Sequence, residues 1–313
     1  MSSILTIVAP VFGLIMIGYV SGRLRLVSQA AGTGIADFAF TLAIPALLCR
    51  TVASAELGSL APVGILGSFY SAGFLTWAAA SLATVFLLRR PVADAPAISM
   101  TSTFGNTIML GIPLAMGVYG AAATPVIALV LAIHAPTWWL TGMLQASTTG
   151  QYEGQSRVSI LKSTLKDLIR NPIVLGILAG ALWRLTGAPL PAAIDRLLQL
   201  MAQASVPTAL VALGLSLVNF EIKGQVPTLI AVTVLKLVYM PVLAWIFATY
   251  VFGLDDMTRG IVTILAAMPT GANAFLFATR LGRAIDSTSG AVALGSLLAA
   301  LTAALLVGTL HAP

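Results

Sequence analysis

Two apolar segments of the chain are each interrupted near the middle by glycine, proline and asparagine. The interruptions read Gly105-Asn106-Thr107-Ile108-Met109-Leu110-Gly111-Ile112-Pro113 and Ala267-Met268-Pro269-Thr270-Gly271-Ala272-Asn273-Ala274-Phe275. A membrane helix broken in this way leaves backbone groups that lipid cannot satisfy, so each break must lie inside protein or beside a water-filled cavity. The second half of a broken helix also presents the positive end of its dipole at mid-membrane, which favours an anion.

The polar and conformationally special residues of the two breaks are therefore predicted to bind a substrate. These candidate residues are Asn106, Thr107, Gly111, Pro113, Pro269, Thr270, Gly271 and Asn273. Pro113 suits a first helical position, where its missing N–H is not needed. The alternative is that the Asn and Thr side chains only satisfy backbone groups freed by the breaks. Because matched interruptions in two halves of a membrane chain indicate a transporter's binding site, the first interpretation is favoured.

Two ionisable side chains within apolar segments are further candidates, since a charge at the centre of a membrane helix costs ~2.5–3.5 kcal/mol. Lys236 is a candidate cation for a carboxylate substrate, with snorkelling or pairing with a backbone carbonyl as the alternative. His134 lies just before Pro136 and belongs to the residue type that titrates near neutral pH. It is a candidate for proton coupling, with a structural hydrogen bond as the alternative.

The elements that position these residues are predicted to be membrane-spanning helices. The chain has 313 residues, of which 58% are hydrophobic and 8% charged, whereas about a quarter of the residues of a soluble protein are charged. Apolar runs long enough to cross a bilayer recur from end to end. The predicted spans are roughly 4–22, 33–53, 62–88, 95–119, 122–144, 171–187, 192–218, 226–252, 257–280 and 287–309. The sequence thus predicts an all-α integral membrane protein with ten transmembrane helices.

The positive charges are distributed unevenly between the loops, which predicts the orientation of the chain. Loops after odd-numbered spans carry Arg23, Arg25, Arg89, Arg90, Arg157, Lys162, Lys166, Arg170, Lys223, Arg280 and Arg283. The cation-rich face is expected to be cytoplasmic, so that both termini lie outside a cell (inner) membrane and the loop 145–170 lies inside. Apolar residues at helical spacing over 158–170 predict an amphipathic helix on the membrane surface, with a plain linker as the alternative.

The two halves of the chain are predicted to form an inverted repeat. A shift of 162 residues places Pro10 on Pro172, Gly18 on Gly180, Pro45 on Pro207 and Gly120 on Gly282. The same shift brings the order of spans and both interruptions into register. Five spans in each half force the second half to insert upside down relative to the first. We assign 1–150 to the first repeat, 151–170 to a cytoplasmic linker and 171–313 to the second repeat.

Several short strings of the sequence resemble the auxin efflux carrier family. They are Pro10-Val11-Phe12-Gly13-Leu14-Ile15-Met16-Ile17-Gly18-Tyr19, Ile44-Pro45-Ala46-Leu47, Asn106-Thr107 with Gly111-Ile112-Pro113, Asn171-Pro172, and Val206-Pro207 with Ala209-Leu210. The resemblance covers essentially the whole chain. It implies a scaffold of spans one, two, six and seven, and a transport domain of spans three to five and eight to ten. Spans four and nine would cross at their broken centres, and a homodimer would form through the scaffold helices.

The predicted function is transport of small organic anions by alternating access around the crossing of spans four and nine. The chain is similar to short-loop, bacterial-type members of the family, which are commonly associated with malate, malonate or similar acids, and it lacks the large loop of the plant PIN-type carriers. Coupling to Na⁺ or H⁺ stays open. The alternative is a sodium-coupled organic-anion carrier that resembles the bile-acid symporter group, with Asn106 and Asn273 among the sodium ligands.

Other functional classes fit the sequence poorly. A zinc protease needs a paired-His motif, but the chain has only His134 and His311, and Asp37 has no second aspartate to form an intramembrane protease pair. No span shows the continuous polar face of a channel. The single cysteine, Cys49, fits neither an intramolecular disulfide nor a Cys-rich metal site. We predict no enzymatic activity, no metal, no cofactor and no nucleic-acid partner.

Overall fold

Over the residues that it describes, the computed structural model of the protein consists of helices and contains no β-strand. The described residues are 2–54, 61–149, 158, 162, 166, 169–222 and 224–310. The α-helices are α1 (Ser2–Arg23), α2 (Gln29–Phe38), α3 (Ile44–Ser54), α4 (Pro62–Leu82), α5 (Ala95–Thr103), α6 (Ile112–Tyr119), α7 (Thr124–Thr148), α9 (Pro172–Leu185), α10 (Ala192–Leu217), α11 (Val226–Val234), α12 (Met240–Ile246), α13 (Asp256–Ala266), α14 (Ala272–Leu281) and α15 (Ile285–Leu310). The predicted all-α fold is confirmed. The amphipathic helix and linker predicted within 151–170 lie largely outside the described residues.

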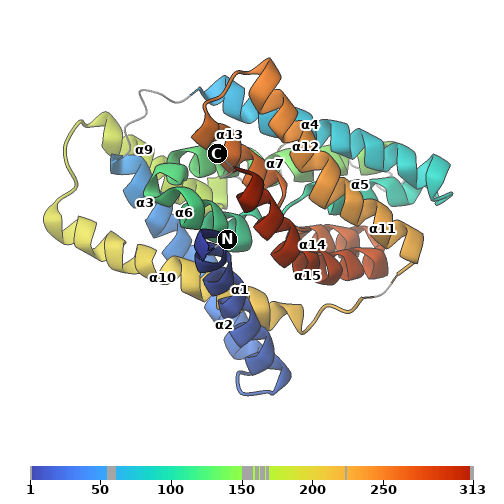
Figure 1. The fold of residues 1–313 in the computed structure, drawn as a ribbon, viewed down its shortest axis with the longest axis horizontal. Coiled ribbons are helices and arrows are strands. Elements are labelled where there is room, and N and C mark those ends of the chain that lie inside the picture. The colour runs from blue at the N-terminus through green and yellow to red at the C-terminus, as the bar shows by residue number, and fades with distance from the viewer. Residues whose placement is uncertain are drawn as a thin grey trace.

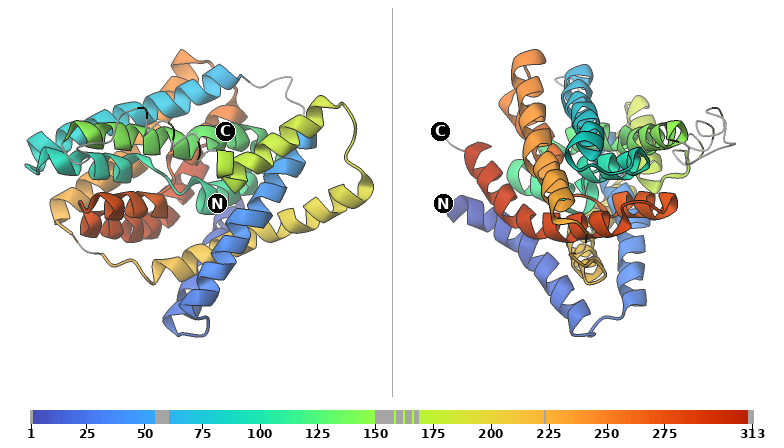
Figure 2. Two further views of the ribbon diagram at one scale, coloured as in Figure 1. Left: turned by 180° about the vertical axis from the view of Figure 1, so that it is seen from behind. Right: turned by 90° about the vertical axis from the view of Figure 1, so that its right-hand side faces the viewer.

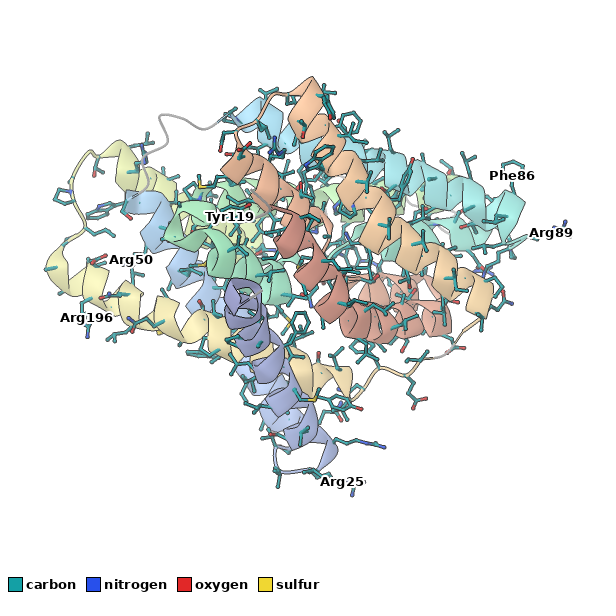
Figure 3. The ribbon with its side chains drawn as sticks, viewed as in Figure 1. Arg25, Arg50, Phe86, Arg89, Tyr119 and Arg196 are labelled. Carbon is teal, nitrogen blue, oxygen red and sulfur yellow. The ribbon has the colours of Figure 1, made fainter. Side chains whose placement is uncertain are left out.

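Helical segments long and apolar enough for a bilayer account for much of the described chain. Six of them qualify by length and composition: Gln29–Ser54, Pro62–Leu87, Thr107–Thr148, Ala192–Leu217, Val226–Val251 and Ile285–Thr309. Ala9–Arg23 and Pro172–Leu185 are shorter apolar helices. Large apolar side chains are exposed along these helices, among them Phe86, which is 75% exposed near one edge of the molecule (Figure 3). Water would not tolerate so much exposed apolar surface, whereas lipid does, so the chain is a helical membrane protein.

Several helices contain a widened, π-helical turn, and three of these turns directly precede an Ile-Pro or Met-Pro pair. They are η1 (Ala39–Ala43), η4 (Thr107–Gly111) and η6 (Leu235–Tyr239), followed by Pro45, Pro113 and Pro241. A proline ring inside an α-helix clashes with the carbonyl four residues earlier and removes one backbone hydrogen bond. The wider turn relieves that clash, which explains its position. The remaining π-turns, η2 (Ala83–Leu87) and η7 (Phe247–Val251), end α4 and α12.

One group of helices packs through close glycine contacts. α1 packs along α10, and α3 packs along α9 and α10 (Figure 1). A Cβ atom on Gly18 of α1 would collide with the carbonyl oxygen of Val211, and one on Gly180 of α9 with that of Cys49. These two contacts are equivalent, because the shift of 162 residues places Gly18 on Gly180 and Cys49 on Val211. Small residues at such crossings let helix backbones approach closely, as membrane helices often do.

α2 also packs against α10 and belongs to this first group. The remaining helices form a second group, in which α4 packs against α5 and α12, and α15 packs against α11 and α14 (Figures 1 and 2). The first turn of α1 and the last turn of α15 lie on the same side of the molecule (Figure 2, right). In the first group, Arg50 of α3 pairs with Asp195 of α10 at 2.8 Å. Arg50 therefore joins two helices.

Candidate functional site

The two sequence interruptions are breaks in helices, and the backbones of the breaks are hydrogen-bonded to each other. α5 ends at Thr103 and helical backbone resumes at Thr107, whereas α13 ends at Ala266 and α14 starts at Ala272. Gly105 and Thr270 form an isolated antiparallel bridge. The Asn106 N–H donates to the Pro269 carbonyl at 2.7 Å, and the Gly271 N–H donates to the Phe104 carbonyl at 2.9 Å. Each break therefore satisfies backbone groups that the other has freed.

Two polar side chains at the breaks form hydrogen bonds with backbone groups. The Asn106 carboxamide oxygen accepts from the Met109 N–H at 3.3 Å and so caps the helical segment that begins at Thr107. The Thr270 hydroxyl donates to the Thr101 carbonyl at 2.8 Å. The hydroxyl of Thr107 is buried and has no hydrogen-bond partner among the described residues. The side chains of Asn106 and Thr270 therefore each make a hydrogen bond to the backbone, and substrate binding by these residues stays a prediction.

Pro113 is at the start of α6, as its residue type suggests, but not at the start of all the helical backbone that follows the break. It lies in the first turn of α6, but η4 runs directly into α6, so helical backbone has already begun at Thr107. The physical reason is the π-turn, which accommodates the proline ring within a continuing helix. Gly111, in the same segment, packs toward Leu265 and Met268 at the second break.

A cavity of about 210 Å³ lies beside the breaks. Its lining residues are Phe40, Thr41, Phe104, Ile108, Leu131, His134, Ala135, Asn171, Pro172, Ile173 and Asn273. Phe104, Ile108 and Asn273 come from the breaks, and the others from η1, α7 and the start of α9. The structure thus brings Asn273 and His134 to one cavity, whereas Asn106 and Lys236 do not line it. Thr41 and Asn171 are polar lining residues that the sequence analysis did not name as substrate candidates, although Asn171 belongs to the quoted Asn171-Pro172 string.

Two helix N-termini border this cavity. Asn171 caps α9 by accepting from the Ile173 N–H at 2.9 Å, and both residues line the cavity. α14 begins after Gly271 without a side-chain cap, and Asn273 is its second residue. No carboxylate is among the described lining residues. Because a helix N-terminus carries partial positive charge and free N–H groups, the electrostatics of this cavity favour an anion.

His134 is an ionisable residue of the cavity wall. Its side chain is 2% exposed and packs edge-on against Phe104, with ring centroids 4.7 Å apart. The ring lies near the Gly105 backbone, but neither nitrogen makes a hydrogen bond of good geometry with a described residue. Buried polar atoms are normally paired. An unpaired imidazole at the edge of a cavity is thus available to a water molecule or a ligand.

Lys236 contacts both breaks from within the protein. Its side chain is 1% exposed, and its ammonium donates to the carbonyl of Ala266 at 2.7 Å and lies 3.1 Å from the sulfur of Met240. Ala266 is the last residue of α13, so the cation lies at the negative end of that half-helix. A Cβ on Gly105 would come within 3.2 Å of the Lys236 Cε and Nζ atoms. No described carboxylate pairs with Lys236, and a backbone carbonyl takes that place.

These features define a helical membrane protein with two broken helices that meet through their backbones. The chain belongs to the membrane transport protein family, whose family model matches residues 3–307. This is the auxin efflux carrier family that the sequence resembles, so the resemblance is confirmed. Membership identifies the chain as a membrane transporter and not as an enzyme.

Curated relatives are similar to most of the chain. A Rhizobium meliloti protein named "Putative malonate transporter" is 26% identical over 304 residues, which cover 96% of this chain and 94% of the relative. The "Uncharacterized transporter YfdV" of Escherichia coli is 22% identical over 87% of this chain and 86% of its own length. The "Lysosomal cholesterol signaling protein" of Mus musculus is 22% identical over 74% of this chain, which corresponds to 28% of that longer protein.

Proposed function

We propose that the protein carries small organic anions, with carboxylates as the substrate class, and that the substrate binds in the cavity beside the breaks. The observation that carries this proposal is the convergence of two helix N-termini, α9 and α14, on a cavity lined by no described carboxylate. The cavity volume of about 210 Å³ is below the ~300–1,000 Å³ typical of drug-sized ligands. A small acid fits this volume, and Asn273, Asn171 and Thr41 supply neutral hydrogen-bonding groups.

The transport cycle that we propose is alternating access between two inverted repeats, 1–150 and 171–313. Support comes from the reciprocal contacts within the protein. Gly18 meets Val211 as Gly180 meets Cys49, and each break donates one N–H to the other. Such exchange of equivalent contacts is what a two-fold relation produces. In this proposal α1–α3, α9 and α10 form the scaffold, α4–α7 and α11–α15 form the transport domain, and the cavity lies between them.

The proposed substrate class is tested by ligand-dependent stability of the purified protein. Malonate and malate are expected to raise the melting temperature, because a ligand present at 100 times its Kd stabilises the folded state by ~2.7 kcal/mol. Malonamide, which has nearly the same shape without the negative charge, is the matched control. Stabilisation by malonamide equal to that by malonate would contradict recognition of an anion.

Transport is expected to proceed without sodium. A sodium site in a broken-helix carrier uses carbonyls at the C-terminal ends of half-helices, and at α13 the ammonium of Lys236 already takes the carbonyl of Ala266. Uptake of radiolabelled malonate into proteoliposomes should therefore be equal in sodium and in N-methylglucamine buffers. A dependence of initial rate on sodium concentration would favour the sodium-coupled alternative.

The proposed orientation places both termini outside and the loop 145–170 in the cytoplasm of a cell whose inner membrane holds the protein. In a Cys49→Ser background, a cysteine at Gln155 should react with an impermeant maleimide only after the membrane is opened. A cysteine at Ala188, in the turn between α9 and α10, is the opposite control and should react in intact cells. External labelling at Gln155 would reverse the topology.

A further inference from the structure

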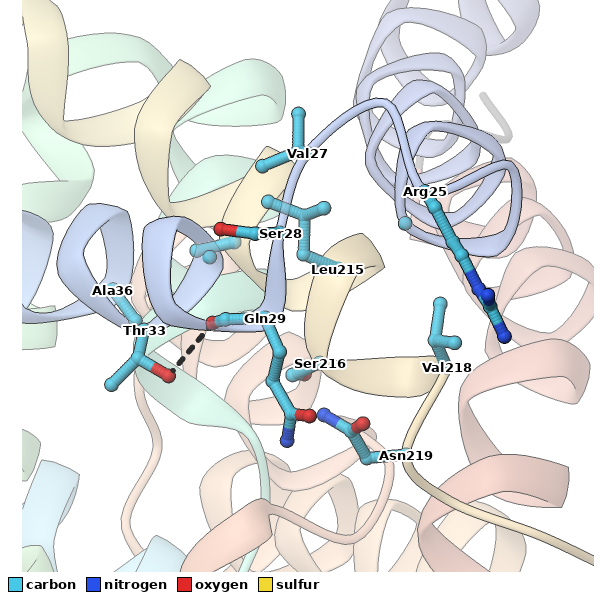
Figure 4. Close-up of a pocket in the computed structure, with 13 residues that line it drawn as sticks. Arg25, Val27, Ser28, Gln29, Thr33, Ala36, Leu215, Ser216, Val218 and Asn219 are labelled. Atoms are coloured by element: carbon cyan, nitrogen blue, oxygen red, sulfur yellow. Dashed lines mark hydrogen bonds between the residues drawn. The ribbon is translucent and has the colours of Figure 1, made fainter.

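A second cavity, of about 510 Å³, lies where the turn between α1 and α2 meets the end of α10 (Figure 4). It is lined by residues of that turn, of the first turns of α2 and of the last turns of α10. None of its lining residues belongs to the cavity beside the breaks. It is therefore a separate site, and the transport mechanism proposed above makes no use of it.

The lining of this cavity carries hydrogen-bond donors and a positive charge. Gln29 and Asn219 contribute carboxamide groups and Ser28 contributes a hydroxyl. The hydroxyls of Thr33 and Ser216 also line the cavity, but each donates its proton to a backbone carbonyl, that of Gln29 and that of Leu213. The carboxamides of Gln29 and Asn219 point toward each other from α2 and from the end of α10 (Figure 4). The one charged residue among the described lining residues is Arg25. A guanidinium together with amide and hydroxyl donors, and without a carboxylate, matches the oxygens of a phosphate.

The backbone at Arg25 is unusual for an arginine. Its φ is 59°, and the Leu26 N–H donates to the Ser21 carbonyl while the Arg25 N–H donates to that of Gly22. These two bonds form the helix ending in which a left-handed residue, usually glycine, follows the last turn. An arginine there bears a conformational cost that glycine avoids. Backbone strain of this kind is a reason to look for a function of the side chain.

Apolar side chains on both sides of Arg25 indicate that the phosphate group belongs to a lipid and is not a free ion. Leu24 and Leu26 are 63% and 74% exposed. Met16, Ile17 and Val20 continue this exposed apolar surface along α1. Figure 3 shows Arg25 at the tip of the α1–α2 hairpin, so the cation lies at the end of a surface suited to acyl chains. A free phosphate ion makes no contact with an apolar surface, whereas the acyl chains of a phospholipid would cover it.

We propose that this cavity binds the phosphate headgroup of an anionic phospholipid, with Arg25 as the cation and the acyl chains along α1. The loop that contains Arg25 lies on the face expected to be cytoplasmic, where anionic lipids attract basic residues. The inference does not rest on the proposed substrate, because the lipid would bind the scaffold side of the protein and not the breaks.

The test is binding of short-chain phosphatidylglycerol to the full-length purified protein, measured by native mass spectrometry and by thermal shift. Phosphatidylglycerol is expected to bind more tightly than phosphatidylcholine of the same chain length. Arg25→Gln should weaken it about fivefold, the equivalent of the ~1 kcal/mol that one basic residue contributes at an anionic membrane surface. Arg25→Gly should weaken it as much while keeping the fold, because glycine suits a φ of 59°.

Arg196→Gln is the matched control, since Arg196 lies toward the other end of α10 and its guanidinium donates to Gln199 (Figure 3). It removes the same charge and should leave lipid binding unchanged. Wild-type affinity in both Arg25 variants would overturn the site. Equal binding of the two lipids to the wild type would overturn recognition of an anionic headgroup. Displacement of the lipid by an equal concentration of inorganic phosphate would overturn the assignment to a lipid.

Discussion

Replacing Asn273 by alanine is expected to weaken substrate binding about five- to a hundredfold. Asn273 is the second residue of α14 and lines the cavity beside the breaks. Loss of its carboxamide leaves a buried substrate group unpaired, which costs ~1–3 kcal/mol, and each ~1.4 kcal/mol is a tenfold change in Kd. The measurement is malonate affinity by calorimetry on purified variants whose folding has been checked by size-exclusion chromatography.

Two further variants show whether this effect comes from the cavity. Thr76→Ala is the control, because Thr76 is fully buried in α4 and donates to Ala72 away from the breaks. It should leave affinity unchanged. Asn106→Ala removes a helix cap, so we expect it to lower stability by ~0.5–2 kcal/mol and to affect binding through the position of its break. Wild-type affinity in both Asn variants would move the binding site away from the breaks.

Replacing Lys236 is expected to reduce transport without a matching loss of stability. The ammonium is enclosed and donates to the Ala266 carbonyl. Because this contact holds the end of α13 beside Gly105 of the other break, its loss should slow malonate uptake at least about tenfold, the equivalent of ~1.4 kcal/mol of activation free energy. A buried charge with no carboxylate partner is itself costly, and Lys236→Met should therefore unfold at the wild-type temperature or above. Transport rate and melting temperature are measured on the same preparations.

The charge and the packing of Lys236 are separated by two more variants. Lys236→Arg keeps the charge but brings a larger, planar head group against Gly105. It should retain more transport than Lys236→Ala, which removes both charge and contact. If both variants transport at the wild-type rate, Lys236 has a structural role only. If Lys236→Met loses stability and transport in proportion, its effect on transport follows from unfolding.

The sequence was sufficient to predict the class of the protein, its all-helical fold and the two breaks, because these depend on local chemistry. Long apolar runs fix membrane helices, and glycine, proline and asparagine interrupt them wherever the chain folds. The same local reasoning did not predict the widened turn η4, which carries helical backbone from Thr107 directly into α6 and Pro113. It also named Asn106 as a substrate ligand without showing that its carboxamide oxygen would cap the Met109 N–H.

Only the tertiary structure decided which groups meet. The hydrogen-bond partner of a freed N–H or C=O group lies far from it in the sequence. The pairing of Asn106 with Pro269, and of Lys236 with Ala266, therefore depends on how distant segments of the chain cross in the fold. The cavity is also a non-local feature, because Thr41 and Asn171 reach it from helices outside the broken pair. The residue types predict an anion near the breaks, and the packing of the N-terminal ends of α9 and α14 decides where the cavity proposed to bind it lies.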